Sequence, residues 1–536
     1  MTRVRNLLFI ALISVTRIPA DELVTVGFKS NGLASLRYAG TEFLGNGDFR
    51  VNRVQLQSGS QAPVDADLNA SIQMDTTRQT LTRLYGWGKV SVIYRAAGNK
   101  LTITVSTYNT SQSTIVGVFY EPLGIQFPAA VTEYDGVDPL LADNIGGPTV
   151  IPASYGSGVM TIANEDVVRP LMVGLPWAWD KPANSFFPLR INTGRDSMYP
   201  DSAQSINRPI APGASDQYEI SIQFGAPGAS AVSLGGDILS RFAAAFPQSI
   251  HWRDHRPIGA LFLATTAAGW VRNPRGWFQD PTVDVTTPAG LTAFHTRVLA
   301  YADTSIAYLR SMNAQGMVTW DIEGEQFPAA TTYLCDPRQL AALAPEMDGV
   351  VDAYFKRFRD AGFRVGICVR PQDLVVAPDL STASQLASSD PADLLIQKIR
   401  YAVNRWNASI FYVDSNGGPN DPMDPAVFRK VSTAFPNVLL MPEHSSPKYY
   451  AYTAPGLGLR DGHAETPSTV RAIYPTAFSV IYTADGPIQQ QIDELRDGVL
   501  HGDILMYRSW FDDEPANSLL KNLFLNIGAP LVLPFR

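Results

Sequence analysis

The chain has 536 residues, of which 45% are hydrophobic and 17% are charged, a composition typical of globular proteins and not of disordered chains. At about 100–200 residues per domain, this length predicts about two to four domains. The net charge of −8, without any run of Lys or Arg, argues against a nucleic-acid-binding surface. Two cysteines are too few for a disulfide framework or a four-cysteine zinc site.

Residues 1–20 have the pattern of a secretory signal. Arg3 and Arg5 precede an apolar run from Leu7 to Val15, and a cut after Ala20 would follow it. We therefore expect a secreted or periplasmic protein. Because Ile18 is larger than the residue usual three positions before a cut, a buried first strand in a cytoplasmic protein is the alternative. The run is shorter than the ~20 residues of a membrane helix, and no other segment reaches that length, so we expect no stable membrane insertion.

Residues 21–226 predict a β-sandwich. Apolar and polar residues alternate along many short stretches, and Gly, Asn, Ser and Pro separate these stretches. Val90, Val92 and Tyr94 fall on one face of a strand, and Leu101, Ile103, Val105 and Thr107 fall on one face of the next. Ala97-Gly98-Asn99 supplies the turn of this hairpin. A further strand carries Tyr218, Ile220, Ile222 and Phe224, and such a succession of short strands is typical of a sandwich.

Residues 227–257 form a linker with a helix over 237–246, and residues 258–536 predict a (β/α)8 barrel. In this last part, short apolar runs alternate with amphipathic helical stretches, as in a barrel of about 250 residues. The expected strands are 258–264, 317–320, 364–369, 409–413, 438–441, 478–482, 504–507 and 531–533. The expected helices are 291–310, 348–361, 392–406, 425–434, 488–500 and 518–525. The connection from Pro447 to Pro475 is long and weakly patterned, which makes the sixth strand the least defined.

Polar and aromatic residues end these apolar runs or follow them directly, where the loops of a barrel converge over its mouth. They are Trp320, Asp321, Glu323 and Glu325 after the second run, Arg370 after the third, Tyr412, Asp414 and Asn416 at the end of the fourth, Glu443 and His444 after the fifth, Asp485 after the sixth, and Arg508 and Trp510 after the seventh. Carboxylates are rarely buried unpaired, since desolvation costs several kcal/mol. Carboxylates interleaved with aromatic rings match the polar hydroxyls and apolar faces of a sugar. Two carboxylates can also cleave a glycosidic bond.

A β-sandwich, a helical linker and a barrel with Tyr-Val-Asp-Ser-Asn ending its fourth strand resemble the retaining α-glycosidases. The α-galactosidase-type families and the endo-α-N-acetylgalactosaminidase family share this layout. The resemblance implies that Asp414 is the nucleophile. It implies Glu443 as general acid/base if the endo-α-N-acetylgalactosaminidase pattern holds, with a Glu after strand five. It implies Asp485 if the α-galactosidase pattern holds, with an Asp after strand six.

Each of these catalytic candidates has a structural alternative. Asp414 can cap the turn that follows it, because Asp-Ser-Asn-Gly is typical of turns. Glu443 can form an ion pair with Arg370 or His444. Asp485 can cap a helix that begins after Gly-Pro.

The binding candidates also have alternatives. Asp321, Glu323 and Glu325 alternate and would share one side of an extended segment, where they could bind sugar hydroxyls, bind Ca²⁺, or remain a solvated loop. Arg370 can pair with a carboxylate or contact substrate, and Trp320 and Trp510 can be core residues or stacking platforms. His444 and His463 are candidate hydroxyl contacts. The two cysteines, Cys335 and Cys368, can be buried thiols or, after export, a disulfide.

Other classes of enzyme lack their motifs. None of the six histidines forms His-x-His or His-Glu-x-x-His, so we expect no transition metal and, Ca²⁺ aside, no cofactor. The nucleotide-binding glycine motifs and the Gly-x-Ser-x-Gly elbow are absent from the sequence. The sequence predicts a glycosidase acting on an oligosaccharide, polysaccharide or glycoconjugate. A transglycosylase and a non-catalytic carbohydrate-binding protein of the same fold are the alternatives.

Overall fold

The structure is a computed structural model. It describes residues 23–133, 147–169, 171–175, 183–193, 208–226, 228–264, 270–324, 334–378, 383–418, 421–483, 486–508 and 518–523. The chain divides into two compact units, and the boundary lies between Ile238 and Leu239, within the predicted linker. The expected signal at 1–20 and the expected strand at 531–533 lie outside the described residues.

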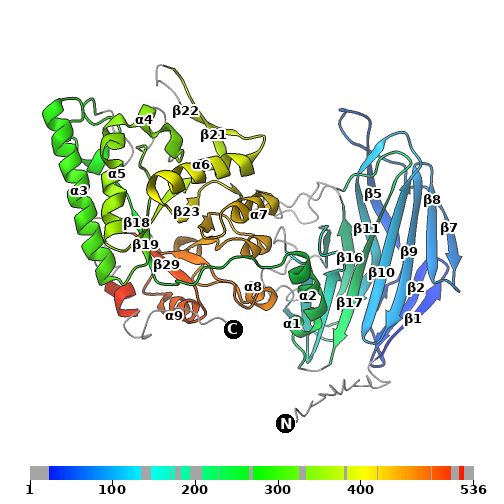
Figure 1. Ribbon diagram of the computed structural model, residues 1–536. Helices are drawn as coiled ribbons and strands as arrows, with labels where there is room; N and C mark the ends of the chain where they lie inside the picture. The colour runs from blue at the N-terminus through cyan, green and yellow to red at the C-terminus, as the bar shows by residue number, and fades with distance from the viewer. Residues whose placement is uncertain are drawn as a thin grey trace, which may run out of the picture. The chain divides into compact units, whose positions relative to one another are not determined.

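The first unit is a β-sandwich of antiparallel sheets, as predicted (Figure 1). The larger sheet has the order β12 (Val131–Glu133), β13 (Val150–Tyr155), β14 (Gly158–Asn164), β17 (Ser215–Gly225), β10 (Lys100–Asn109), β9 (Gly88–Ala97), β8 (Thr80–Tyr85), β7 (Ala70–Asp75). The second has the order β15 (Met172–Gly174), β16 (Phe186–Asn192), β11 (Thr114–Gln126), β5 (Arg50–Gln57), β6 (Val64–Asp65), and β4 (Leu44–Asn46) pairs with β11. A small third sheet contains β1 (Val24–Lys29), β2 (Gly32–Tyr38) and β3 (Thr41–Glu42).

The alternating residues of the predicted strands form the core of this sandwich. Every second residue of β9, β10 and β17 is buried, as the sequence pattern requires. The two large sheets face one another through aromatic side chains. The Tyr94 hydroxyl on β9 donates to the Pro122 carbonyl on β11 (2.7 Å), and the Tyr120 and Tyr218 rings lie 5.8 Å apart. The helices α1 (Ala231–Leu234) and α2 (Gly236–Ala245) follow β17, and α2 matches the predicted helix.

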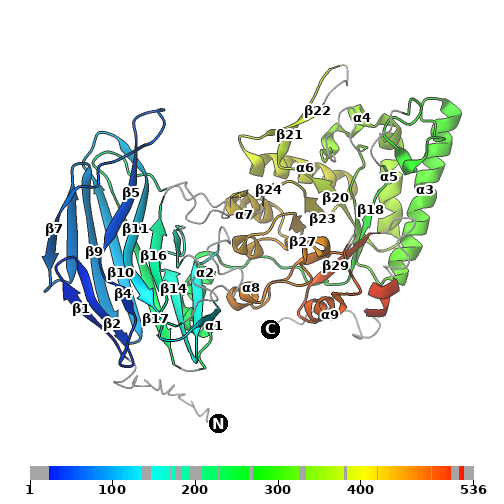
Figure 2. The same ribbon diagram turned by 180° about the vertical axis from the view of Figure 1, so that it is seen from behind.

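The second unit is a parallel (β/α)8 barrel, also as predicted. Its sheet has the order β26 (Leu439–Pro442), β23 (Ile410–Val413), β20 (Arg364–Val369), β19 (Gly316–Thr319), β18 (Ile258–Leu261), β29 (Ile504–Arg508), β28 (Val480–Tyr482), β27 (Gly456–Gly458). The two ends of this sheet approach one another, because the Ala454 amide donates to the Leu440 carbonyl (3.0 Å). Figure 2 labels β18, β20, β23, β27 and β29 of this sheet.

Helices surround these strands, and several begin at a proline that follows a capping residue. The helical segments are η3 (Trp277–Gln279), α3 (Pro288–Ser311), η4 (Pro337–Gln339), α4 (Leu340–Leu343), α5 (Pro345–Asp360), α6 (Pro391–Trp406), α7 (Pro425–Ala434), η5 (Pro447–Ala451), η6 (Leu459–Asp461), α8 (Ser468–Ile473) and α9 (Ile492–Leu500). The Thr287, Asp390 and Asp424 side chains each accept a backbone N–H at a helix start. Two hairpins complete the unit: β21 (Gln372–Val376) with β22 (Ala383–Ala387), and β24 (Gly417–Gly418) with β25 (Asp421–Pro422). No described helix combines the length and the apolar character that a membrane span requires.

The order of the last barrel strands differs from the prediction. The sixth strand is β27, inside the connection that the sequence left without a strand. The run predicted as the sixth strand is therefore the seventh, β28, and the run predicted as the seventh is the eighth, β29. The prediction failed because β27 reads Gly-Leu-Gly and offers a single apolar side chain to the pattern.

Candidate active site

A pocket of about 230 Å³ opens at the carboxyl ends of the barrel strands. Phe262, Trp320, Tyr412, Asp414, Glu443, Gly456, Leu457, Gly458, Arg460, Asp461 and Tyr482 line it. These residues lie at or just beyond the ends of β18, β19, β23, β26, β27 and β28. The pocket is therefore at the face of the barrel where the sequence placed the functional residues.

Asp414 comes directly after β23, and its carboxylate is held by an arginine. Both Nε and Nη2 of Arg370 bind the same oxygen, Oδ2, at 2.7 and 2.5 Å. The other oxygen, Oδ1, accepts a longer hydrogen bond of 3.2 Å from the Ser415 hydroxyl. Asp414 is 6% exposed and lines the pocket. Arg370 is thus the ion-pair partner of Asp414, one of the two roles that the sequence left open.

Glu443 follows β26 and lies beside Asp414. The Ser415 amide donates to its Oε2 at 2.8 Å. Burial, the charge of Asp414 and a hydrogen bond with Asp414 raise the pKa of Glu443 to about 7. Glu443 is therefore a carboxyl group that holds a proton near neutrality, next to a carboxylate bound to Arg370. The two residues converge on one pocket, as the proposed pair requires.

Asn416 joins the two loops that carry these acids. Its side-chain amide donates to the His444 carbonyl at 3.1 Å and accepts from the His444 amide at 2.9 Å. Asn416 is fully buried and is not among the residues that line the pocket, so it is placed to position the loops and not to contact a ligand. The His444 imidazole lies 3.8 Å from Glu443, and burial lowers the pKa of His444.

Asp321 and Glu323, predicted to bind sugar hydroxyls or Ca²⁺, lie below the surface of the pocket. Asp321 is fully buried, and its carboxylate accepts hydrogen bonds of 2.7–3.3 Å from the backbone amides of Leu263 and Ala264. These bonds connect the loop after β18 to the end of β19. Glu323 is 1% exposed. Neither residue lines the pocket, so the structure gives these two acids a place different from the predicted one. Glu325 lies outside the described residues.

Aromatic side chains form much of the wall of the pocket. The Trp320 ring lies 4.6 Å from Tyr412, 5.5 Å from Phe262 and 6.1 Å from Tyr482. Trp320 was predicted, and it is both a pocket residue and a core residue, with 6% exposure. Phe262 and Tyr482 were missed, although each ends or directly follows an apolar run, which is the signal that identified Trp320.

The corrected strand order changes the second acid/base candidate. Asp485 follows the seventh strand and not the sixth, and it lies outside the described residues. The aspartate that follows the sixth strand is Asp461, which lines the pocket together with Arg460. Asp461 was missed because its strand was missed.

Two further predicted residues, Arg508 and His463, are described by the structure. Arg508 ends β29 and is half-buried, and His463 is exposed; neither is among the residues that line the pocket. Trp510 lies outside the described residues.

No protein-family model matches the sequence, and no curated protein matches it either. Solved structures that are similar to the chain include α-galactosidases and an α-N-acetylgalactosaminidase. A glycoside hydrolase family 36 α-galactosidase variant from Geobacillus stearothermophilus, in complex with 1-deoxygalactonojirimycin, is 12% identical with a TM-score of 0.41, over 94% of this chain and 84% of that one. The α-N-acetylgalactosaminidase of Bifidobacterium bifidum, in complex with GalNAc, is 8% identical with a TM-score of 0.46, over 80% and 77%. An α-galactosidase from Lactobacillus brevis is 12% identical with a TM-score of 0.39, over 91% and 71%.

Proposed function

We propose that the protein is a retaining glycoside hydrolase with Asp414 as nucleophile and Glu443 as general acid/base. The observation that carries this proposal is the pairing of two unlike carboxyl groups in one pocket. One is bound by a guanidinium group, and the other has a pKa raised to about 7. When the environments of two carboxyl groups favour different protonation states, the ionised group is suited to act as the nucleophile and the protonated group as the acid.

The geometry favours retention. Glu443 and Asp414 are close enough for hydrogen bonding between their carboxyl groups. An inverting pair is ~6.5–9.5 Å apart to admit a water molecule, whereas a retaining pair is closer, at ~5–5.5 Å. Oδ2 of Asp414 is occupied by Arg370, so Oδ1 is the oxygen available to attack the anomeric carbon. Glu443 then protonates the departing oxygen and, in the second step, removes a proton from water.

The pocket suits the end of a sugar chain. Its volume of about 230 Å³ and its wall of aromatic rings fit one pyranose with its apolar face on a ring. Arg460 and Asp461 belong to the same pocket and are largely exposed, where a second sugar unit would begin. We propose an oligosaccharide or glycoconjugate substrate with an α-linkage, and export as the N-terminal pattern indicates.

The test uses aryl α- and β-glycosides with good and poor leaving groups. Asp414→Asn should lower kcat on all of them by about 10⁴-fold or more in a protein that is still folded, because the carboxylate nucleophile is lost. Glu443→Gln should spare glycosides with good leaving groups, which need little protonation, and should remove the alkaline limb near pH 7 from the pH profile of kcat/KM. NMR of the first-formed anomer reports retention.

Asp461→Asn is the matched control for the acid role. A selective loss on poor leaving groups in Asp461→Asn, and not in Glu443→Gln, would move the acid role to Asp461. Full activity of Asp414→Asn would overturn the proposal. If no glycoside is cleaved while sugars bind with Asp414-dependent affinity, the protein is a carbohydrate-binding protein on this fold. Transfer to an added sugar acceptor in preference to water would identify a transglycosylase.

A further inference from the structure

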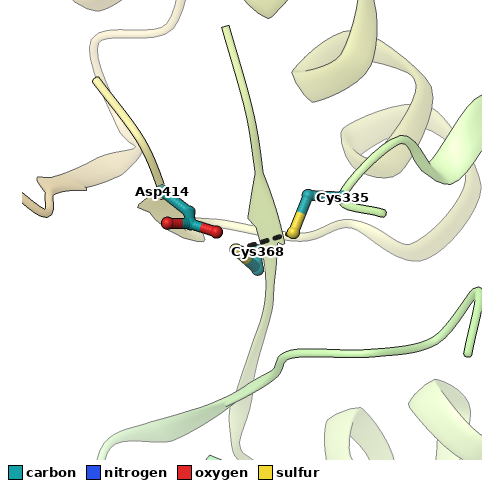
Figure 3. Close-up of side chains that lie close together, drawn as sticks. All are labelled: Cys335, Cys368 and Asp414. Atoms are coloured by element: carbon teal, nitrogen blue, oxygen red, sulfur yellow. Dashed lines mark hydrogen bonds between the residues drawn. The ribbon is translucent and has the colours of Figure 1, made fainter. Parts of the chain in front are cut away.

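The two cysteines of the chain lie against one another directly behind Asp414 (Figure 3). Cys368 is on β20, and Cys335 precedes η4. Their sulfur atoms are 3.0 Å apart across 33 residues of sequence, and the two side chains are 1% and 0% exposed. Both are free thiols in this structure. Because the two sulfur atoms are already this close, a small movement of one side chain would allow a covalent bond between them.

The pair is joined to the arginine that holds the nucleophile. Arg370 comes two residues after Cys368, and its backbone amide donates to the Cys335 carbonyl at 3.3 Å. The thiol sulfurs and a carboxylate oxygen of Asp414 all lie within 4.8 Å of one another. A bond between the sulfurs would therefore fix the segment before η4 to the strand that presents Arg370.

The backbone at Cys335 shows that this approach is maintained against a local cost. Its φ is 50°, in the left-handed region, which disfavours a residue with a side chain. Such a conformation persists only where the surroundings enforce it. Here it places the Cys335 sulfur against Cys368.

We propose that Cys335 and Cys368 are a disulfide-forming site, closed by a low-molecular-weight disulfide such as oxidised glutathione as the chain folds. The sulfurs of a disulfide are ~2.05 Å apart, so closure moves them by about 1 Å. One thiolate attacks the glutathione disulfide and releases one glutathione thiolate. The second cysteine thiolate then attacks the mixed disulfide and releases the second glutathione. Two electrons pass from the cysteines to the oxidant, and two protons leave the cysteine thiols.

This thiol–disulfide exchange takes place during folding, before the two cysteines are buried. Burial raises the pKa of both thiols, which disfavours the reactive thiolates once the barrel has formed. The exchange is therefore fast before the site is packed and slow afterwards, and the finished bond is shielded from reductants in the same way.

The experiment compares the full chain refolded with oxidised glutathione and refolded with a thiol reductant. After refolding with oxidised glutathione, thiol titration under denaturing conditions should find no free thiol. Peptide mapping without reduction should recover Cys335 and Cys368 in one linked peptide. The linked protein should unfold roughly 5–10 °C above the reduced one, because the cross-link closes a loop of 33 residues.

Single and double variants provide the controls. Cys335→Ser and Cys368→Ser each retain one cysteine and should show one free thiol or one mixed glutathione disulfide. The double variant should lose the dependence of unfolding temperature on the oxidant. Recovery of two free thiols in the wild type after refolding with oxidised glutathione would overturn the proposal. Binding of added Zn²⁺ by those thiols would not change this conclusion. None of these measurements uses a substrate, so the result is independent of the proposed function.

Discussion

Two glutamates of the barrel have pKa values raised by burial, and their surroundings give that shift different consequences. Glu443 lines the pocket, so its proton can be transferred to a ligand. Glu323 is sealed within the protein, and within the part of the chain that the structure describes neither of its carboxyl oxygens has a hydrogen-bond partner in another residue. Burial, with the charges of Asp336 and Asp321, raises the pKa of Glu323 to about 8 against the opposing effect of Lys398. At neutral pH, Glu323 is therefore a neutral acid whose titration affects stability.

Replacing Glu323 by Gln should make the protein more stable at alkaline pH. Because the folded pKa of about 8 exceeds the ordinary glutamate pKa of 4.5, folding favours the protonated acid. The associated stability is present below pH 4.5 and is lost as the pH rises to about 8, at ~1.4 kcal/mol per pH unit. Glu323→Gln has a similar shape and does not titrate. Its unfolding temperature should match that of the wild type near pH 5 and exceed it at pH 8 and above.

Thermal unfolding across this pH range measures the effect. Glu494→Gln on α9 is the matched control, since Glu494 is exposed and its replacement should leave the wild-type pH dependence in place. If Glu323→Gln follows the wild-type curve at every pH, Glu323 is ionised in the folded protein and the interpretation is wrong.

The elements of the barrel were predicted wherever the burial of their side chains produces a recognisable apolar pattern in the sequence. Strands such as β20 are continuous apolar runs that are buried almost throughout, and helices such as α6 have a buried face that recurs with the helical period. In β27 a glycine occupies a position where a side chain would meet its neighbours; a Cβ on Gly456 would lie 3.2 Å from the Tyr412 ring and 3.3 Å from the Pro442 carbonyl oxygen. Close approach of the backbone replaces hydrophobic burial there, and a pattern of side chains does not contain that information.

The same limit separates the site residues that were found from those that were misplaced. Asp414 and Glu443 follow apolar strands directly, so their position on the barrel followed from the strand order. The role of Asp321 depends on the amides of Leu263 and Ala264, which lie 57–58 residues away in sequence. Which acids face a pocket and which bind a neighbouring loop is decided by such distant partners.

Substitutions of Asn416 test how strongly the loop after β23 and the loop after β26 are coupled. Asn416→Ala removes both hydrogen bonds to His444 and should lower kcat by about 10–100-fold, because a displacement of about 1 Å between Asp414 and Glu443 costs that much. Asn416→Asp keeps the acceptor for the His444 amide and should have an intermediate effect. In both variants kcat should change more than KM.

Steady-state kinetics, with the unfolding temperature as reference, measures this coupling. Asn404→Ala on α6 is the control, since Asn404 is exposed and its loss should alter neither quantity. If Asn416→Ala raises KM at constant kcat, Asn416 contacts the substrate, as the sequence analysis expected, and does not position the loops.

At the scale of the whole molecule, the described residues of each unit have a hydrophobic core of their own. The core of the sandwich is formed by alternating residues of its sheets, and the core of the barrel by residues such as Ile258, Val318 and Met441. Each unit has its own buried set, so each can be perturbed by a substitution within it. The candidate active site is built entirely from residues of the second unit.

A cavity in the sandwich should therefore weaken the first unit and leave catalysis unchanged. Ile103 on β10 is fully buried, and Ile103→Ala should cost about 2–5 kcal/mol of stability. Hydrogen exchange, followed peptide by peptide, should show lost protection in β9, β10 and β17 and unchanged protection in β19, β20 and β23. Thr102→Ala, on the opposite face of the same strand, should change little. If Ile103→Ala weakens the barrel strands equally, the two units unfold as one, because a lesion confined to one core can reach the other only through cooperative unfolding.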